Sequence, residues 1–129
     1  MIGYVTLGTN DREKGAKFYD AIFAELGAGR MMENETFIAW GEPGGGAGIG
    51  LTKPFDGKPA TVGNGVMVAL AAKDTAQVHR LHEIALANGG TCEGEPGDRG
   101  GGFYAGYFRD PDGNKLNAFV MPQGDQAGE

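Results

Sequence analysis

Residues 108–120 read FRDPDGNKLNAFV and contain the most informative turn of the chain. The letters DPDGN, at 110–114, favour a tight turn because proline presets φ and glycine tolerates positive φ. A strand-like pattern precedes this turn at 103–108, and another follows it at 115–120. The segment is therefore predicted to form a β-hairpin.

Upstream of the hairpin, the pattern indicates a strand at 65–71 and then a helix. Asp74 is the predicted N-cap of that helix, because aspartate accepts hydrogen bonds from the first free amides. Gly89 and Gly90 are predicted to end the helix, and a further short strand is expected at 91–93. This half of the chain therefore reads as a βαβββ unit.

The first half shows the same order of elements. A strand is predicted at 2–9, a helix capped by Asn10 or Asp11 continues to about Leu26, and three strands follow near 30–32, 36–40 and 49–51. An offset of 63 residues aligns the halves, with Asp11 on Asp74 and Gly27 on Gly90. Chance similarity of two strand–helix units is the alternative to a duplication.

One domain is predicted over residues 1–129, because this length fits a single core. The first module covers about 1–53 and the second about 63–121, with a short C-terminal tail at 122–129. A linker is expected at about 54–62, where prolines remove amide donors and oppose regular structure.

The fold class predicted from this order is α+β, with two βαβββ modules forming a curved, half-barrel mixed sheet that carries its helices on the outer face. Side chains alternate along a strand, so one face should pack on helices and the other should line a concave cleft. The helix-facing set is Val5, Leu7, Val66, Val68, Leu70, Leu116, Ala118 and Val120. The cleft-facing set is Tyr4, Thr6, Met67, Ala69, Asn117 and Phe119.

Composition excludes several classes of function. The net charge is −6, with 17 acidic against 11 basic residues, and no basic face for nucleic acid is visible. No apolar run is long enough to span a membrane, and no secretory signal is seen at the start. Cys92 is the single cysteine, so we expect a reducing, cytoplasmic location.

Three further segments complete a likeness to a known family: YVTLGTND at 4–11, KFYDAIFAELG at 17–27 and KPFDGKPATVGNGVMVAL at 53–70. With the hairpin, they resemble the vicinal oxygen chelate superfamily, which includes glyoxalase I, bleomycin-resistance and fosfomycin-resistance proteins, and extradiol dioxygenases. The resemblance implies metal ligands at Tyr4, Met67 and Asn117, and a further one near Gly50. None of these is a good ligand here, so neither metal nor cofactor is expected.

The favoured function is therefore binding of an apolar or aromatic small molecule without metal, and no catalytic residue is assigned. One alternative is an enzyme of this superfamily, similar to lactoylglutathione lyase or a dioxygenase, that uses unusual ligands such as Glu33, Glu35 or Glu42. A second alternative is a protein–protein association module. The family resemblance also implies a homodimer. The predicted ligand-binding residues are Tyr4, Thr6, Trp40, Met67, Arg99, Tyr104, Asn117 and Phe119.

Three other features receive a structural interpretation. His79 and His82 share one face of the second helix, but no third metal ligand is near them in the sequence. Cys92 has no neighbouring cysteine and no evident base, so it is expected to be structural. Arg109 is expected to pair with acidic neighbours at the turn.

Overall fold

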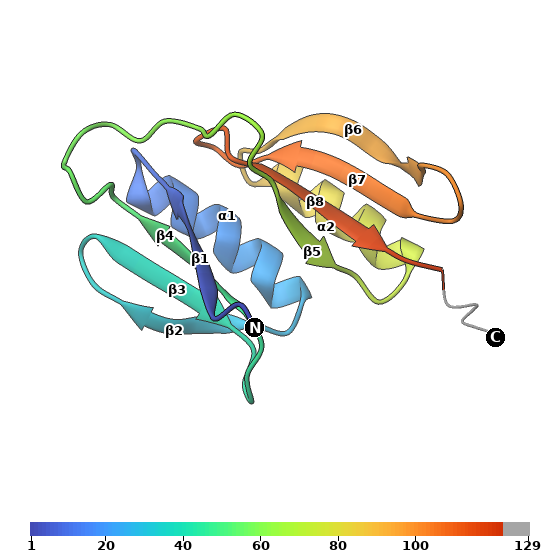
Figure 1. The fold of residues 1–129 in the computed structure, drawn as a ribbon, viewed down its shortest axis with the longest axis horizontal. Helices are drawn as coiled ribbons and strands as arrows, with labels where there is room; N and C mark the ends of the chain where they lie inside the picture. The colour runs from blue at the N-terminus through green and yellow to red at the C-terminus, as the bar shows by residue number, and fades with distance from the viewer. Residues whose placement is uncertain (123–129) are drawn as a thin grey trace.

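The structure is a computed structural model that describes residues 1–122, and Figure 1 shows its two modules side by side. Both modules have the predicted order βαβββ. The first contains β1 (Tyr4–Gly8), α1 (Arg12–Glu25), β2 (Gly29–Glu33), β3 (Phe37–Gly41) and β4 (Gly48–Thr52). The second contains β5 (Val68–Ala71), α2 (Thr75–Ala87), β6 (Thr91–Asp98), β7 (Tyr104–Arg109) and β8 (Lys115–Val120).

Each module forms its own four-stranded mixed sheet, in the order β1-β4-β3-β2 and β5-β8-β7-β6. The first strand of each module pairs in parallel with the last, and the remaining pairs are antiparallel. The α+β class and the two unclosed mixed sheets agree with the prediction. The inner edges, β1 and β5, lie in the middle of the view in Figure 1.

The helices cover one face of the sheets, and we call the opposite side the open face (Figure 1). The core lies between helices and sheets, because the apolar stripes of α1 and α2 meet alternate strand residues there. One predicted core residue is misplaced: Val66 is exposed, because β5 begins only at Val68 and the amide of Val66 bonds to Gly63 in a turn. The buried core includes Phe18, Tyr19, Ile22, Ile38, Leu51, Val78, Leu81, Phe108 and Leu116.

The two modules keep the predicted offset only as far as their helix caps. Asp11 accepts a hydrogen bond from the amide of Lys14, and Asp74 accepts one from the amide of Gln77. However, α1 has 14 residues and α2 has 13. The positive-φ glycines that follow them are therefore Gly27 and Gly89, and the predicted match of Gly27 with Gly90 was wrong by one residue.

The turn at 110–114 closes the predicted hairpin and also attaches the second module to the first. Within the turn, the amide of Gly113 donates to the Asp110 carbonyl at 2.9 Å. The Tyr19 hydroxyl on α1 donates to Asp110 Oδ2 at 2.6 Å, and Asn114 Nδ2 donates to the Gly8 carbonyl at 2.9 Å. A third bond joins the amide of Asn10 to Asp112 Oδ1 at 2.8 Å.

The segment between β4 and β5 contains no helix or strand, as the prolines predicted. It is held to the first module by Asn10, whose side chain donates to the carbonyl of Ala60 and accepts from the amide of Ala60. None of the helices among residues 1–122 has the length and hydrophobicity that a membrane crossing requires.

Candidate ligand-binding site

The open face of the first sheet contains an apolar hollow of about 640 Å³, which we call the first-sheet hollow. Tyr4 on β1 and Met32 on β2 border it, and both are largely exposed, at 65% and 55%. Its other side chains are mainly apolar, with Asn34 and Glu42 as polar members. The apolar residues that line it include Met31, Phe37 and Ala39.

Glycine shapes the floor of this open face. Gly50 on β4 lies beneath the ring of Phe37, and a Cβ atom added at Gly50 would meet Phe37 Cε1 at 2.7 Å and Thr6 Cγ2 at 3.3 Å. Because glycine has no side chain, the Phe37 ring can lie close against the strand at this position. The place where the resemblance put a fourth metal ligand is therefore covered by an aromatic ring.

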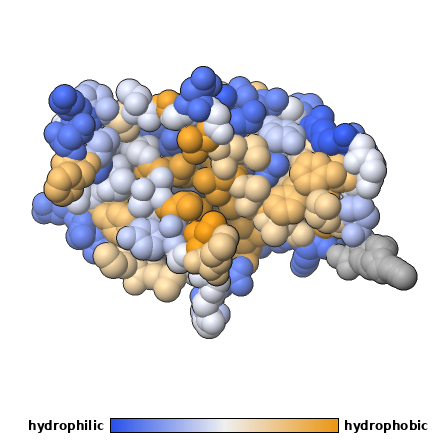
Figure 2. Space-filling view, viewed as in Figure 1, coloured by the Kyte–Doolittle hydropathy of each residue, from blue (hydrophilic) through white to orange (hydrophobic). Residues whose placement is uncertain are grey.

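A second cavity, of about 470 Å³, lies between the modules. Val5 and Ile49 border it from the first sheet, and Met67 and Val68 border it from the second. In Figure 2, hydrophobic surface is gathered along the middle of the open face, over β1 and β5. The two cavities together give this face its apolar character.

Two predicted cleft residues lie instead on the helix side of the sheets. Trp40 is only 1% exposed, and its Nε1 donates to Asp20 Oδ1 on α1 at 2.8 Å, although it also borders both cavities. The Tyr104 hydroxyl lies 2.6 Å from His79 Nε2 on α2. The register of these middle strands was uncertain by one residue from the sequence alone. A shift of one residue moves a side chain from one face of the sheet to the other.

Asp20 holds Trp40 in place as part of a small polar group at the edge of the core. The Arg30 guanidinium donates to Asp20 at 2.8 and 3.0 Å. These bonds lower the pKa of Asp20, and the bond from Trp40 acts in the same direction while partial burial opposes it. Asp20 is therefore ionised at neutral pH and neutralises Arg30 beside the hollow.

Arg99 is held within its own hairpin, beside Tyr107 on β7. Its guanidinium donates to the carbonyls of Glu95 and Ala105 within its own hairpin, and it lies 5.3 Å from the centroid of the Tyr107 ring. Tyr107, which pairs with Asn117 in the β7–β8 register, was not among the predicted site residues. Strand alternation would have identified it had the register been known.

Phe119 and Asn117 lie on β8. The Phe119 ring stacks on Phe103, with centroids 5.7 Å apart. Asn117 is 1% exposed, and its Oδ1 atom has no hydrogen-bond partner among the described residues. Thr6 pairs with Gly50, and Ala69 pairs with Asn117, so Gly50 and Asn117 occupy equivalent places in the two sheets.

Within residues 1–122, the three positions at which the resemblance implied metal ligands do not border one common cavity among those described here. Tyr4 borders the first-sheet hollow, Met67 borders the cavity between the modules, and Asn117 is buried. Phenol, thioether and neutral amide are also a weak donor set for the divalent ions of such sites. The residues present therefore do not fit a resident metal in the cleft.

The acidic residues proposed as unusual ligands do not gather either. Glu33 lies 3.2 Å from Arg30 and 3.8 Å from Arg12 in ion pairs. Glu42 borders both cavities. Arg109 pairs as expected with an acidic group, although that partner is Glu93 on β6, at 3.3 Å, rather than a residue of the turn.

Comparison with solved structures finds the same fold in other proteins. A glyoxalase/bleomycin resistance protein from Albidiferax ferrireducens T118 is 41% identical, with a TM-score of 0.86 over 95% of this chain and 99% of that one. A glyoxalase-related enzyme from Fulvimarina pelagi is 23% identical, with a TM-score of 0.78 over 95% and 88%. A lactoylglutathione lyase from Agrobacterium tumefaciens is 19% identical, with a TM-score of 0.69 over 93% and 92%.

A search of curated proteins finds no match. A family model does match, over residues 1–118, and thus over nearly all of both modules, up to Ala118 in β8. The matched range includes the turn at 110–114 and the positions Tyr4, Gly50, Met67 and Asn117. The chain belongs to the Glyoxalase/Bleomycin resistance protein/Dioxygenase superfamily.

Proposed function

We propose that this protein binds a flat, mostly apolar small molecule on its open face, in the first-sheet hollow, without a metal ion in the cleft. The observation that carries the proposal is the hollow itself, whose volume of about 640 Å³ is that of a small-molecule site. Phe37 and Met32 offer a ring and an adaptable thioether for packing on an aromatic ligand.

The polar groups around the hollow are suited to orienting a neutral ligand rather than to binding a charged one. The Tyr4 hydroxyl can donate and accept a hydrogen bond, so it can orient a carbonyl or hydroxyl group. The described residues that line the hollow include no cation, and Arg30 on the neighbouring strand β2 already bonds to Asp20 and Glu33. A phosphate or other strongly anionic ligand would therefore find no free partner at this site.

Trp40 makes the proposal testable, because it is the only tryptophan and borders the hollow. Titration with a panel of planar aromatic compounds should quench or shift its emission for some of them. Met32→Glu should weaken binding of the best compound by at least about tenfold, because it places a charge in an apolar site. Leu86→Glu is the matched control, since Leu86 is exposed on α2 and borders neither cavity.

Binding should be the same with and without a strong chelator. If no compound changes Trp40 emission or the melting temperature, the small-molecule proposal fails. Equal weakening by Met32→Glu and Leu86→Glu would also contradict it, because the effect would then not belong to the hollow.

A further inference from the structure

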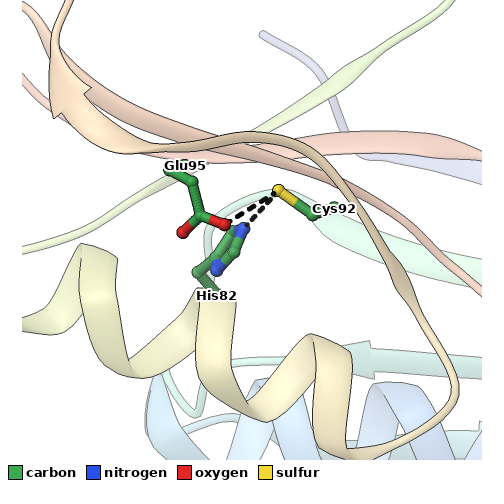
Figure 3. Close-up of side chains that lie close together, drawn as sticks. All are labelled: His82, Cys92 and Glu95. Carbon is green, nitrogen blue, oxygen red and sulfur yellow. Dashed lines mark hydrogen bonds between the residues drawn. The ribbon is translucent and has the colours of Figure 1, made fainter.

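Three side chains converge on the helix side of the second module, away from both cavities (Figure 3). His82 on α2 places its Nε2 atom 3.2 Å from Cys92 Sγ on β6. Cys92 Sγ lies 3.6 Å from Glu95 Oε2, also on β6. The three ligand atoms all lie within 4.8 Å of one another.

A bulge in β6 brings Cys92 and Glu95 to the same side of the strand. Residues three apart on a regular strand point to opposite faces. Here Cys92 pairs with Phe108 and Gly94 pairs with Tyr107, so β6 carries one extra residue between the two pairs. The extra residue reverses the alternation, and both side chains then face α2. Because of this reversal, strand alternation alone did not indicate a third ligand for His82.

Two of the three separations are close to those of ligands around one tetrahedral ion, and the third is within 4.8 Å. With Zn–N of about 2.0 Å and Zn–S of about 2.3 Å, tetrahedral angles separate two ligand atoms by about 3.5 Å. The observed separations are 3.2 Å for His82–Cys92 and 3.6 Å for Cys92–Glu95. An ion can therefore be accommodated with small side-chain movements and without moving the strand.

We propose that His82, Cys92 and Glu95 form a binding site for a divalent transition-metal ion of the zinc class. Thiolate and imidazole together select Zn²⁺ and its neighbours over Mg²⁺ and Ca²⁺, which prefer oxygen ligands. Because Cys92 and Glu95 are exposed, a water molecule can complete the coordination as the fourth ligand.

The surroundings of the cluster favour metal binding. Glu95 is in no salt bridge among the described residues, whereas the neighbouring Glu93 pairs with Arg109 and Lys115. The His82 ring packs against the Phe108 ring, with centroids 6.3 Å apart, and His82 is only 3% exposed.

The same three residues do not make a convincing nucleophilic site. A thiol nucleophile needs a substrate pocket beside it. None of the cavities described above is bordered by His82, Cys92 or Glu95. A small ion needs no such pocket.

Cobalt titration of the reduced, chelator-treated protein tests the proposal, because a Co²⁺–thiolate bond gives a charge-transfer absorption band. Wild type should bind one Co²⁺ per chain with such a band, and Zn²⁺ should displace it and raise the melting temperature. Cys92→Ser should lose the band. Glu95→Gln should weaken Zn²⁺ binding by at least about tenfold, because even outer-shell partners are worth that much.

Glu93→Gln and His79→Gln are matched controls on the same strand and helix, and both should bind metal as wild type does. Glu95 and Cys92 are exposed, so their variants should fold, and circular dichroism verifies this. The absence of a thiolate band in wild type would overturn the proposal, as would unchanged Zn²⁺ affinity in Cys92→Ser. Neither result would bear on the first-sheet hollow, which lies on the opposite side of the sheets.

Discussion

At the scale of single residues, the most constrained group is the pair Tyr19 and Asp110. Both are buried, and the hydroxyl of one donates to the carboxylate of the other across the two modules. Burial raises the pKa of Asp110, and the hydrogen bond from Tyr19 partly offsets that rise. Burial also raises the pKa of Tyr19, with the charge of Asp110 acting in the same direction.

Tyr19→Phe should destabilise the protein by about 1–3 kcal/mol, because the buried Asp110 Oδ2 atom loses one of its two donors and keeps only Asn114 Nδ2. It should also raise the pKa of Asp110 further, since the lost bond stabilised the ionised form. Carbon NMR titration of the Asp110 carboxyl and urea unfolding measure the two effects.

The pH dependence has a defined sign. The folded pKa of Asp110 is above its unfolded value, so its contribution to stability is complete below the unfolded pKa and is lost as pH rises through the folded pKa. Because Tyr19 favours the ionised form, the stability difference between wild type and Tyr19→Phe should grow over that same rise. A difference that shrinks with rising pH would contradict this account.

At the scale of elements, the sequence was sufficient for the order and type of all helices and strands. Local signals determine these features, such as the caps Asp11 and Asp74 and the turn at 110–114. Register was not predictable, because it depends on pairing between distant strands. The face of Trp40 and the bulge that joins Cys92 to Glu95 both follow from register. The residues that border the cavities were therefore only partly predicted from the sequence. The convergence of His82, Cys92 and Glu95 was not predicted.

One cross-strand contact on the open face can be tested directly. Gly50→Ala should destabilise the protein by about 1–3 kcal/mol, because the new methyl group would overlap the Phe37 ring. In a Phe37→Ala background the same change should cost much less, since the obstructing ring is gone. Urea unfolding of the four proteins gives the coupling energy. Equal costs in both backgrounds would show that the ring does not determine the choice of glycine.

At the scale of the whole molecule, hydrophobic surface gathers along the middle of the open face, and such patches can mark sites of protein association (Figure 2). β2 is exposed along its whole length and lies at the outer edge of its sheet, yet it contains Met31 and Met32. Exposed methionine side chains on a strand at a sheet edge offer a contact for a second copy of the chain. This surface is the structural reason to expect association.

Light scattering should therefore give twice the chain mass of 13.4 kDa at tens of micromolar, roughly the range in which specific contacts persist. Met31→Lys should shift the protein towards monomer by placing a charge in the contact. Leu86→Lys, on the outer side of α2, should leave the mass unchanged. A monomer throughout this range would contradict the expected homodimer.

The turn at 110–114 has a counterpart in the first module, the β3–β4 connection at residues 42–47, and the two have diverged in role. The later turn bonds to Tyr19, Gly8 and Asn10 across the modules. Among residues 1–122, no hydrogen bond joins 42–47 to the second module. After a duplication, natural selection would thus act on the two copies unequally. The glycine-rich connection can gain or lose residues over generations without loss of such bonds, whereas an insertion at 110–114 would disrupt three of the hydrogen bonds that join the modules.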